Sequence, residues 1–253
     1  MSLTKIALRF AAPVPKIGAY RRYLFIGPHP DDIEIGAGAT AARLAAEGKD
    51  VCFLVCIDGR FGDGGTELRG DALAAHRQAE AIASAKALGV TDVRFLNLCD
   101  GGFYEMSELE TKMAQVIGDF KPEMIFAPDP DVTSECHADH LNVGNAAKKL
   151  ACFLPYPGIA ANFGAESAPI EAVAFYFTAK PNRYFGTRGY VRKQLDAIFD
   201  CHLSQFPGDS GSAIRLYLKL RAADYGIRTL RGTAEGFRVL GQTHMHCLPE
   251  AGN

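Results

Sequence analysis

The sequence predicts an α/β fold with three layers, in which a mostly parallel, Rossmann-like sheet carries helices on both faces. Short apolar runs alternate with alanine-rich or amphipathic segments from residue 22 to residue 152. The run at residues 51–57, VCFLVCI, is apolar at every position, as expected for a strand buried between two helix layers. Strands that alternate with helices in this way are joined by right-handed crossovers and lie parallel in one sheet.

This alternation also sets the expected boundaries of the elements. Strands are expected at residues 22–26, 51–57, 93–98 and 124–127. Helices are expected at residues 35–47, 71–88, 107–120 and 139–152. Ser107 and Glu110 are expected to form a capping box at the start of the third helix. After Pro155 the pattern weakens, so the C-terminal third is expected to be irregular, with a strand at 173–178 and helices at 191–201 and 212–225.

Length and composition indicate a soluble protein with one main domain. The 253 residues allow one or two domains, and the continuous alternation favours a single domain at 22–253 after an N-terminal extension at 1–21. The net charge of −2 provides no basic surface for nucleic acid or an anionic membrane. No apolar run is long enough for a transmembrane helix, and residues 1–22 lack the apolar core of a secretory signal.

The cysteines favour a cytoplasmic location. All seven are scattered, and no pair has C-x-x-C spacing. This pattern argues against a disulfide scaffold or a zinc ribbon and fits a reducing compartment. Most of these thiols are expected to be buried as small apolar side chains, and Cys136 is expected to be a spare loop thiol.

Two segments rich in metal-ligand residue types follow predicted strands. His29-Pro30-Asp31-Asp32 follows the strand at 22–26, and His137-Ala138-Asp139-His140 follows the strand at 124–127. In an open parallel sheet, ligands bind at the carboxyl ends of the strands. In the common strand order 3-2-1-4 these two strands are neighbours, so the two segments would face each other across one crevice.

The spacing within these segments predicts a metal site. His29 and Asp32 are three residues apart at a strand-to-helix turn, and His137 and His140 repeat this offset at the next helix start. Imidazole and carboxylate ligands suit zinc or another borderline divalent ion. Three protein ligands would leave a position open for water, and Asp31 could take the proton of that water.

Each segment also has a purely structural interpretation. Asp31 or Asp32 could cap the following helix, and the segment from His137 to His140 could cap the helix after it. Because both segments follow strands that can share one sheet edge, the metal site is favoured over two unrelated caps.

Further motifs accompany these two segments. The first segment continues as PHPDDIEIGAG from Pro28, and the second reads HADH from His137. Together they resemble the motifs of the PIG-L/LmbE-like family of metal-dependent deacetylases, which remove acetyl groups from N-acetylglucosamine units of small conjugates or lipids. Weaker matches to family signatures are Arg77-Gln78-Ala79-Glu80, Leu88-Gly89-Val90, Asp100-Gly101-Gly102, His202-Leu203-Ser204-Gln205 and Ala234-Glu235-Gly236-Phe237. The resemblance covers about residues 23–239 and is strongest to the bacterial branch that acts in thiol-cofactor biosynthesis.

The resemblance implies a metal centre and a base. It makes His29, Asp32 and His140 the zinc ligands, and Asp31 the general base that activates water. The implied cofactor is Zn²⁺, with Fe²⁺ or another divalent ion as the alternative.

The resemblance also implies roles for four further residues. His137 would stabilise the oxyanion or donate a proton to the leaving amine, and Asp139 would orient a histidine. Arg77 and Asp100 match family positions that contact the sugar or its appended group.

The sequence departs from the thiol-biosynthesis branch at two places. Glu135-Cys136 stands where relatives of that branch often carry an arginine before the second motif. Residues 183–190 lack the acidic residue that is common after the Lys180-Pro181-Asn182 segment. Both departures indicate an altered substrate, since all the metal and base positions are intact.

Other motifs have plainer interpretations. Arg77 and Glu80 could form an ion pair along a helix, and His202 could either pack near the end of its helix or line the site. The glycine-rich segment at 58–70 lacks the G-K-[ST] of a phosphate-binding loop and is expected to be a mobile loop beside the site. A dinucleotide-binding module is not expected, because no G-x-G-x-x-G follows the first strand.

These observations predict a metal-dependent hydrolase that removes an acetyl group from an N-acetylglucosamine-type conjugate. Its partner is expected to be a small-molecule substrate, with no nucleic acid and no membrane span, and assembly into a homo-oligomer is left open. Two alternatives are a zinc amidase that acts on another amide, such as a thiol conjugate, and a non-catalytic metal-binding protein.

Overall fold

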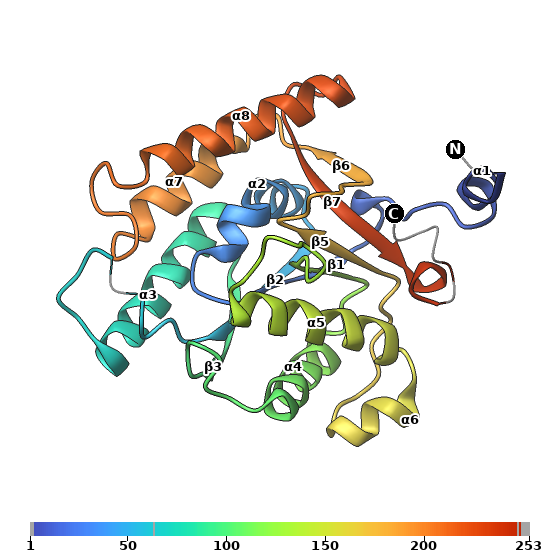
Figure 1. The fold of residues 1–253 in the computed structure, drawn as a ribbon, viewed down its shortest axis with the longest axis horizontal. Coiled ribbons are helices and arrows are strands. Elements are labelled where there is room, and N and C mark those ends of the chain that lie inside the picture. Colours follow the sequence, from blue (N-terminus) through green and yellow to red (C-terminus); the bar gives the residue numbers. More distant parts are fainter. Residues whose placement is uncertain (1–2, 63, 247, 249–253) are drawn as a thin grey trace.

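The fold is a seven-stranded sheet with helices on both faces (Figure 1). The computed structural model describes residues 3–62, 64–246 and 248. The strands are β1 (Arg22–Gly27), β2 (Asp50–Ile57), β3 (Asp92–Leu98), β4 (Met124–Pro128), β5 (Ala172–Tyr176), β6 (Arg183–Gly186) and β7 (Ala234–Gly241). The α-helices are α1 (Leu3–Ala11), α2 (Asp32–Ala46), α3 (Gly70–Leu88), α4 (Met106–Phe120), α5 (Ala138–Phe153), α6 (Pro157–Ala160), α7 (Val191–Cys201) and α8 (Ser212–Thr229). Short 3-10 helices lie at Ile17–Ala19, Ala161–Phe163 and Gln242–Met245.

The strand order brings the two motif-bearing segments together. The sheet runs β3-β2-β1-β4-β5-β7-β6, and the first five of these strands are parallel. The predicted 3-2-1-4 order is therefore confirmed, with Phe25 of β1 paired opposite Phe126 of β4. Because β1 and β4 point the same way, the segments that follow them start at the same edge of the sheet.

The C-terminal third is more regular than the sequence suggests. It supplies β5, β6 and β7, and β7 pairs antiparallel with both of the others. The expectation of an irregular C-terminal third was wrong because Glu235 and Arg238 interrupt the apolar pattern of β7, yet both are buried. Glu235 accepts a hydrogen bond from the backbone of Thr40, and Arg238 pairs with Asp129. These tertiary partners satisfy the polar side chains that hide the strand in the sequence.

Both faces of β1 are buried, which confirms the three-layer architecture. Leu24 and Ile26 pack with residues of α4 and α5, whereas Tyr23 and Phe25 pack with residues of α2, α3 and α7. A strand that is buried on both faces is held rigidly by its neighbours. The first motif therefore begins at the end of a strand that is held rigidly.

Helix α2 approaches the sheet closely at Gly36. A Cβ atom at this position would lie 2.2 Å from Cδ2 of Tyr176, the last residue of β5. The Tyr176 hydroxyl in turn donates a 2.8 Å hydrogen bond to the carbonyl oxygen of Ile26 in β1. Only glycine permits this approach, which holds the start of α2 against the ends of β1 and β5.

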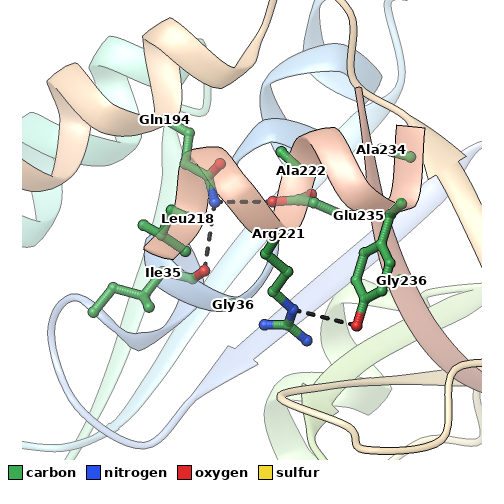
Figure 2. A pocket seen from close by; sticks show the side chains of 10 residues that line it. Ile35, Gly36, Gln194, Leu218, Arg221, Ala222, Ala234, Glu235 and Gly236 are labelled. Atoms are coloured by element: carbon green, nitrogen blue, oxygen red, sulfur yellow. Dashed lines mark hydrogen bonds between the residues drawn. The ribbon is translucent and has the colours of Figure 1, made fainter. Parts of the chain in front are cut away.

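A small pocket lies between α2, α7, α8 and β7 (Figure 2). Gln194 of α7 donates hydrogen bonds to Glu235 of β7, at 2.9 Å, and to the carbonyl oxygen of Ile35, at 3.4 Å. Burial raises the pKa of Glu235 to about 7. Arg221 points toward Tyr225 on the same helix, and its Nε donates a 3.4 Å hydrogen bond to the tyrosine hydroxyl. The contacts of Gln194 tie α7 to the helix that follows the first motif.

Helix α4 starts one residue earlier than predicted. It begins at Met106, with Glu105 at the cap position, and no side chain caps it. The predicted capping box of Ser107 and Glu110 was therefore wrong. Glu110 instead pairs with Lys149 of α5, at 2.6 Å, because the two helices lie side by side.

The segment before β1 is partly built into the core. Ile17 and Tyr20 are buried together with residues of β1. Helix α1 lies away from the sheet (Figure 1), and its Leu3 and Phe10 are exposed. The division into an extension at 1–21 and a domain at 22–253 stays a prediction. Within the described residues, no helix is long and apolar enough to cross a membrane.

The cysteines are less buried than expected. Of the six described, Cys52 and Cys56 of β2 are buried, whereas Cys136 is exposed, as expected for a loop thiol. The prediction that most are buried was wrong for this part of the chain, because the remaining three lie at or near the ends of elements and are partly exposed: Cys99, Cys152 and Cys201. Cys247 lies outside the described residues.

Candidate metal centre

The first motif forms a tight turn between β1 and α2. The Asp32 carboxylate accepts a 2.9 Å hydrogen bond from the backbone N–H of His29 and closes the turn. Asp31 has a φ of 123°, which non-glycine residues rarely adopt. Such strain costs about 1–3 kcal/mol and is concentrated at functional sites. Asp31 occupies the N-cap position of α2 but makes no capping hydrogen bond, so the interpretation of this motif as a carboxylate cap was wrong.

The second motif caps α5 through its first histidine. His137 occupies the N-cap position, and its Nδ1 accepts a 3.3 Å hydrogen bond from the backbone N–H of Asp139. The structural interpretation of this segment as a cap is therefore confirmed. With Nδ1 as an acceptor, the neutral ring carries its proton on Nε2. The His137 side chain is 47% exposed, so this N–H can reach a ligand.

Three residues from the two motifs converge on one point. His29 Nδ1 lies 3.2 Å from Oδ2 of Asp32, and His140 Nε2 lies 3.4 Å from the same oxygen. Possible ligand atoms of these three residues all lie within 4.8 Å of one another. This trio is the ligand set implied by the family resemblance, and it matches the donor types and number of a catalytic zinc site.

A second trio shares His29. His29, His137 and Asp139 also place possible ligand atoms within 4.8 Å of one another. In this trio, however, His137 Nδ1 already accepts the capping hydrogen bond from the backbone of Asp139. The trio of His29, Asp32 and His140 therefore fits an ion better.

Further carboxylates lie behind both histidines of that trio. The Nε2 atom of His29 lies 3.1 Å from Oδ1 of Asp100 and 3.2 Å from Oδ2 of Asp139. The Nδ1 atom of His140 lies 3.1 Å from Oε2 of Glu135. Histidines that bind metals usually donate their second N–H to a carboxylate or carbonyl, which fixes the ring and makes it a stronger ligand. The residues present therefore fit a divalent ion.

The charges of the cluster also favour a cation. Burial alone would lower the pKa of His29, but hydrogen bonds to Asp100, Asp139 and Asp32 raise it to about 12. Burial alone would raise the pKa of Asp32, but hydrogen bonds from His140 and His29 hold it well below its usual range. Carboxylates thus gather around the His29 ring, and a divalent ion would supply a positive charge among them.

Asp31 stands apart from these ligands and faces Arg77. Burial raises the pKa of Asp31 to about 6, and the negative charge of Asp32 acts in the same direction. Arg77 opposes this shift, since its Nη2 atom lies 3.4 Å from Oδ2 of Asp31. A carboxylate with a pKa near 6 can accept and release protons close to neutrality.

The two predicted substrate residues are engaged by the protein itself. The guanidinium of Arg77 is buried and donates hydrogen bonds to the carbonyl oxygens of Gly59, at 3.0 Å, and Pro30, at 2.9 Å. Asp100 is buried against His29 and accepts a 3.2 Å hydrogen bond from the backbone of Phe61. A contact of either side chain with a sugar stays a prediction.

The ion pair considered for Arg77 and Glu80 was wrong. Glu80 points the other way and accepts hydrogen bonds from the backbone and hydroxyl of Ser204, at 2.8 and 2.5 Å. Residues three apart on a helix are neighbours, but a buried partner from another element satisfies each of these two charges better.

Part of the glycine-rich segment at 58–70 is fixed by hydrogen bonds beside the centre. A Cβ atom at Gly59 or Gly62 would lie 2.4 Å from Nη1 of Arg77, so a side chain at either position would displace the guanidinium. Gln205 donates a 2.5 Å hydrogen bond to the carbonyl oxygen of Gly62. These contacts place the segment next to Arg77, which faces Asp31; the mobility of the segment stays a prediction.

Sequence reasoning assigned no role at the site to Glu34 or Glu135, and it left two interpretations open for His202. Glu135, interpreted as a departure from the family pattern, is the partner of His140. Glu34, within the first motif, accepts a hydrogen bond from Ser84 and lies 3.4 Å from Nε2 of His202. His202 is fully buried at the end of α7, as one of its two interpretations expected. A glutamate between two isoleucines just after a metal-ligand motif is the signal that could have revealed Glu34.

The comparisons with known proteins agree with this geometry. Residues 24–151 match the family described as PIG-L, GlcNAc-PI de-N-acetylase, and this range contains both motifs. The chain belongs to the PIG-L family. The family resemblance predicted from the sequence is thus confirmed, and so is the fold class apart from the irregular C-terminal third.

Two curated members of the PIG-L family and one solved structure are similar to the chain. The diacetylchitobiose deacetylase of Thermococcus kodakarensis is 31% identical, over 98% of this chain and 93% of that protein. The 1D-myo-inositol 2-acetamido-2-deoxy-alpha-D-glucopyranoside deacetylase of Streptomyces avermitilis is also 31% identical, over 69% of this chain and 66% of that protein. The structure of N,N'-diacetylchitobiose deacetylase from Pyrococcus horikoshii superposes with a TM-score of 0.88 at 29% identity, covering 98% of this chain and 97% of that one.

Proposed function

We propose that this PIG-L family protein is a zinc-dependent N-deacetylase that acts on a small N-acetylglucosamine-type conjugate. The observation that carries the proposal is the convergence of His29, Asp32 and His140 beside a separate carboxylate, Asp31. A structural metal site needs no such carboxylate. The relatives named as deacetylases of diacetylchitobiose and of an inositol glycoside support the substrate class.

Zinc would be held by His29, Asp32 and His140, and Fe²⁺ would suit the same ligands. When bound, the ion polarises the amide carbonyl and lowers the pKa of water to about 7. Asp31 then accepts the proton of the attacking water, because its pKa near 6 leaves it ionised at neutral pH. Asp100, Asp139 and Glu135 hold the two histidines in place.

His137 acts on the oxygen of the amide, whereas Asp31 acts on the attacking water. Its Nε2–H donates a hydrogen bond to the oxygen that gains negative charge as the amide carbon becomes tetrahedral. Its ring stacks on His140, with centroids 4.8 Å apart, so the donor lies next to the proposed ligands. The proton that the leaving amine needs is the one that Asp31 took from the attacking water, because a neutral His137 ring that gave up its single N–H proton would become an imidazolate. Arg77 keeps Asp31 oriented, and contact of Arg77 or Asp100 with the sugar is part of the same proposal.

The experiment is to measure release of free amine from N-acetylglucosamine, N,N'-diacetylchitobiose and N-acetylglucosaminyl inositol. Zinc-loaded protein should release amine, and EDTA-treated protein should not. Asp31→Asn should keep stoichiometric zinc but lose about 10²-fold or more in kcat, the usual scale for loss of an acid or base group. Zinc-bound protein that hydrolyses none of these substrates would contradict the proposal.

The alternatives give different results in the same experiment. An amidase for another amide would leave the sugars intact but release amine from a thiol conjugate in a chelator-sensitive way. A non-catalytic metal-binding protein would bind zinc and hydrolyse nothing, and Asp31→Asn would then change no property of the bound ion.

We further propose a cytoplasmic location, because the cysteines are scattered. The state of assembly is to be measured on the same samples.

A further inference from the structure

Two exposed phenylalanines lie at the sheet edge that carries the metal centre. Phe61 follows β2 and Phe103 follows β3, and their side chains leave the residues 58% and 72% exposed. The two rings meet edge to face, with centroids 6.2 Å apart and an angle of 84° between their planes. Neither ring belongs to any of the hydrophobic core clusters. Exposed rings that pair with each other but not with the core commonly mark a binding surface.

Both phenylalanines are anchored to the carboxylates of the centre. The backbone N–H of Phe61 donates to Oδ2 of Asp100, whose other oxygen contacts His29. The turn before Phe103 is fixed in the same way, because the N–H groups of Gly101 and Gly102 donate to Asp139 at 2.9 and 3.0 Å. The backbone that carries the two rings is therefore held beside the proposed ligands.

The surroundings of the two rings favour an uncharged partner. Arg60 precedes Phe61, but its guanidinium is paired with Asp58, at 2.6 Å, and with Asp71, at 3.1 Å. It is therefore already neutralised and a poor site for a phosphate or a carboxylate. Two aromatic rings whose adjacent arginine is already paired suit the C–H face of a sugar, which is apolar although its rim is polar.

We propose that Phe61 and Phe103 form a stacking platform for a second pyranose ring, the one joined to the N-acetylglucosamine unit that loses its acetyl group. The inference rests on the proposed function and deepens it, since it assigns the conjugate to disaccharides or longer saccharides. The acetamido group would occupy the metal centre, and the neighbouring ring would lie on the platform.

The test compares one and two sugar rings. Phe61→Ala and Phe103→Ala should each raise the KM for N,N'-diacetylchitobiose roughly 3- to 10-fold, the scale of one aromatic contact. The KM for N-acetylglucosamine and the kcat for both should stay within about 2-fold. Phe103→Tyr, which keeps the ring, should restore the disaccharide KM, whereas Phe103→Leu should not. Phe10→Ala removes an equally exposed ring on α1 and should change nothing.

A binding assay separates this inference from the proposed function. The chain contains no tryptophan, so Phe103→Trp introduces a single indole whose emission reports on the platform. Titration of the EDTA-treated variant with N,N'-diacetylchitobiose should shift this emission saturably, and titration with N-acetylglucosamine should not. A saturable shift, together with no hydrolysis by the zinc-loaded protein, would leave the platform standing and refute the deacetylase. No shift with the disaccharide, or equal KM changes for one and two rings, would overturn the platform even if the enzyme is active.

Discussion

Replacement of Arg77 by methionine tests whether this side chain holds the base and the glycine-rich loop in place. Methionine fills a similar apolar volume but donates no hydrogen bonds. In the structure the guanidinium donates to the carbonyl oxygens of Gly59 and Pro30, at 3.0 and 2.9 Å, and lies 3.4 Å from Asp31. The substitution therefore removes two hydrogen bonds and one positive charge at once.

The expected loss of stability follows from burial. Arg77 is only 3% exposed, so water cannot replace its donors without opening the site. A buried acceptor without a partner costs about 1–3 kcal/mol. The carbonyl of Pro30 would be left in this state, whereas that of Gly59 still accepts a 3.2 Å hydrogen bond from the N–H of Gly62, so Arg77→Met should lower the free energy of unfolding by about 1–3 kcal/mol. For a protein of this size, 1 kcal/mol shifts the Tm by roughly 2–4 °C, and the Tm should fall by at least about 2 °C.

The same change should affect catalysis through Asp31. The positive charge of Arg77 lowers the pKa of this carboxyl, which burial has raised to about 6. Without that charge the pKa rises further, so the acid limb of the kcat/KM profile should move to higher pH. The kcat should fall because the carboxylate is no longer held, and zinc binding should be retained because no ligand changes.

Thermal unfolding and pH profiles check these expectations, with Lys86→Met as the control. Lys86 is exposed on the same helix, and its loss should change the stability by less than about 0.5 kcal/mol. A Tm of Arg77→Met within 1 °C of the wild type, with the acid limb unmoved, would refute the reasoning. If only the KM rises, Arg77 contacts the substrate, as the family resemblance implies.

Three other expectations concern the metal, the base and the packing of α2. Asp32→Ala should lose stoichiometric zinc, measured by metal analysis after gel filtration, because both histidines of the trio meet at its carboxylate; full retention would contradict the ligand set. In the zinc-loaded wild type, kcat/KM should fall as the pH drops through about 6, because protonated Asp31 cannot act as a base. A bound zinc ion lowers the pKa of Asp31, so the fall would then come at a lower pH. An acid limb of the kcat/KM profile above pH 7 would exclude this base. Gly36→Ala should cost about 1–3 kcal/mol in chemical denaturation, because its Cβ would clash with the buried Tyr176 ring, whereas Gly158→Ala, with open space, should cost less than about 1 kcal/mol.

The convergence of His29, Asp32 and His140 could be predicted from the sequence because its signals are local. His29 and Asp32, and likewise His137 and His140, are each placed by one turn at the end of a strand, and the residue types alone limit the chemistry. The strand order that joins the two turns was taken from the common 3-2-1-4 order of open parallel sheets, and the sheet has this order.

The features that the sequence missed depend on distant partners. The strand β7 was hidden because Glu235 and Arg238 are polar, and partners far away in the chain, such as Thr40 and Asp129, make their burial acceptable. The predicted capping box of Ser107 and Glu110 failed for the same reason, because Glu110 pairs with Lys149 on another helix and not with the start of its own helix.

The sequence by itself determined the α/β architecture, the family and the residues able to bind a metal, because periodicity and short motifs act within a few positions of the chain. Only the tertiary structure decided which polar groups form hydrogen bonds or ion pairs with each other. It buried Arg77 against two loop carbonyls and placed Asp100 and Glu135 behind the histidines. It also set Phe61 beside Phe103 at the same edge. A buried charge takes whichever partner the fold brings within hydrogen-bonding distance, and that distance is set by packing across the whole sheet.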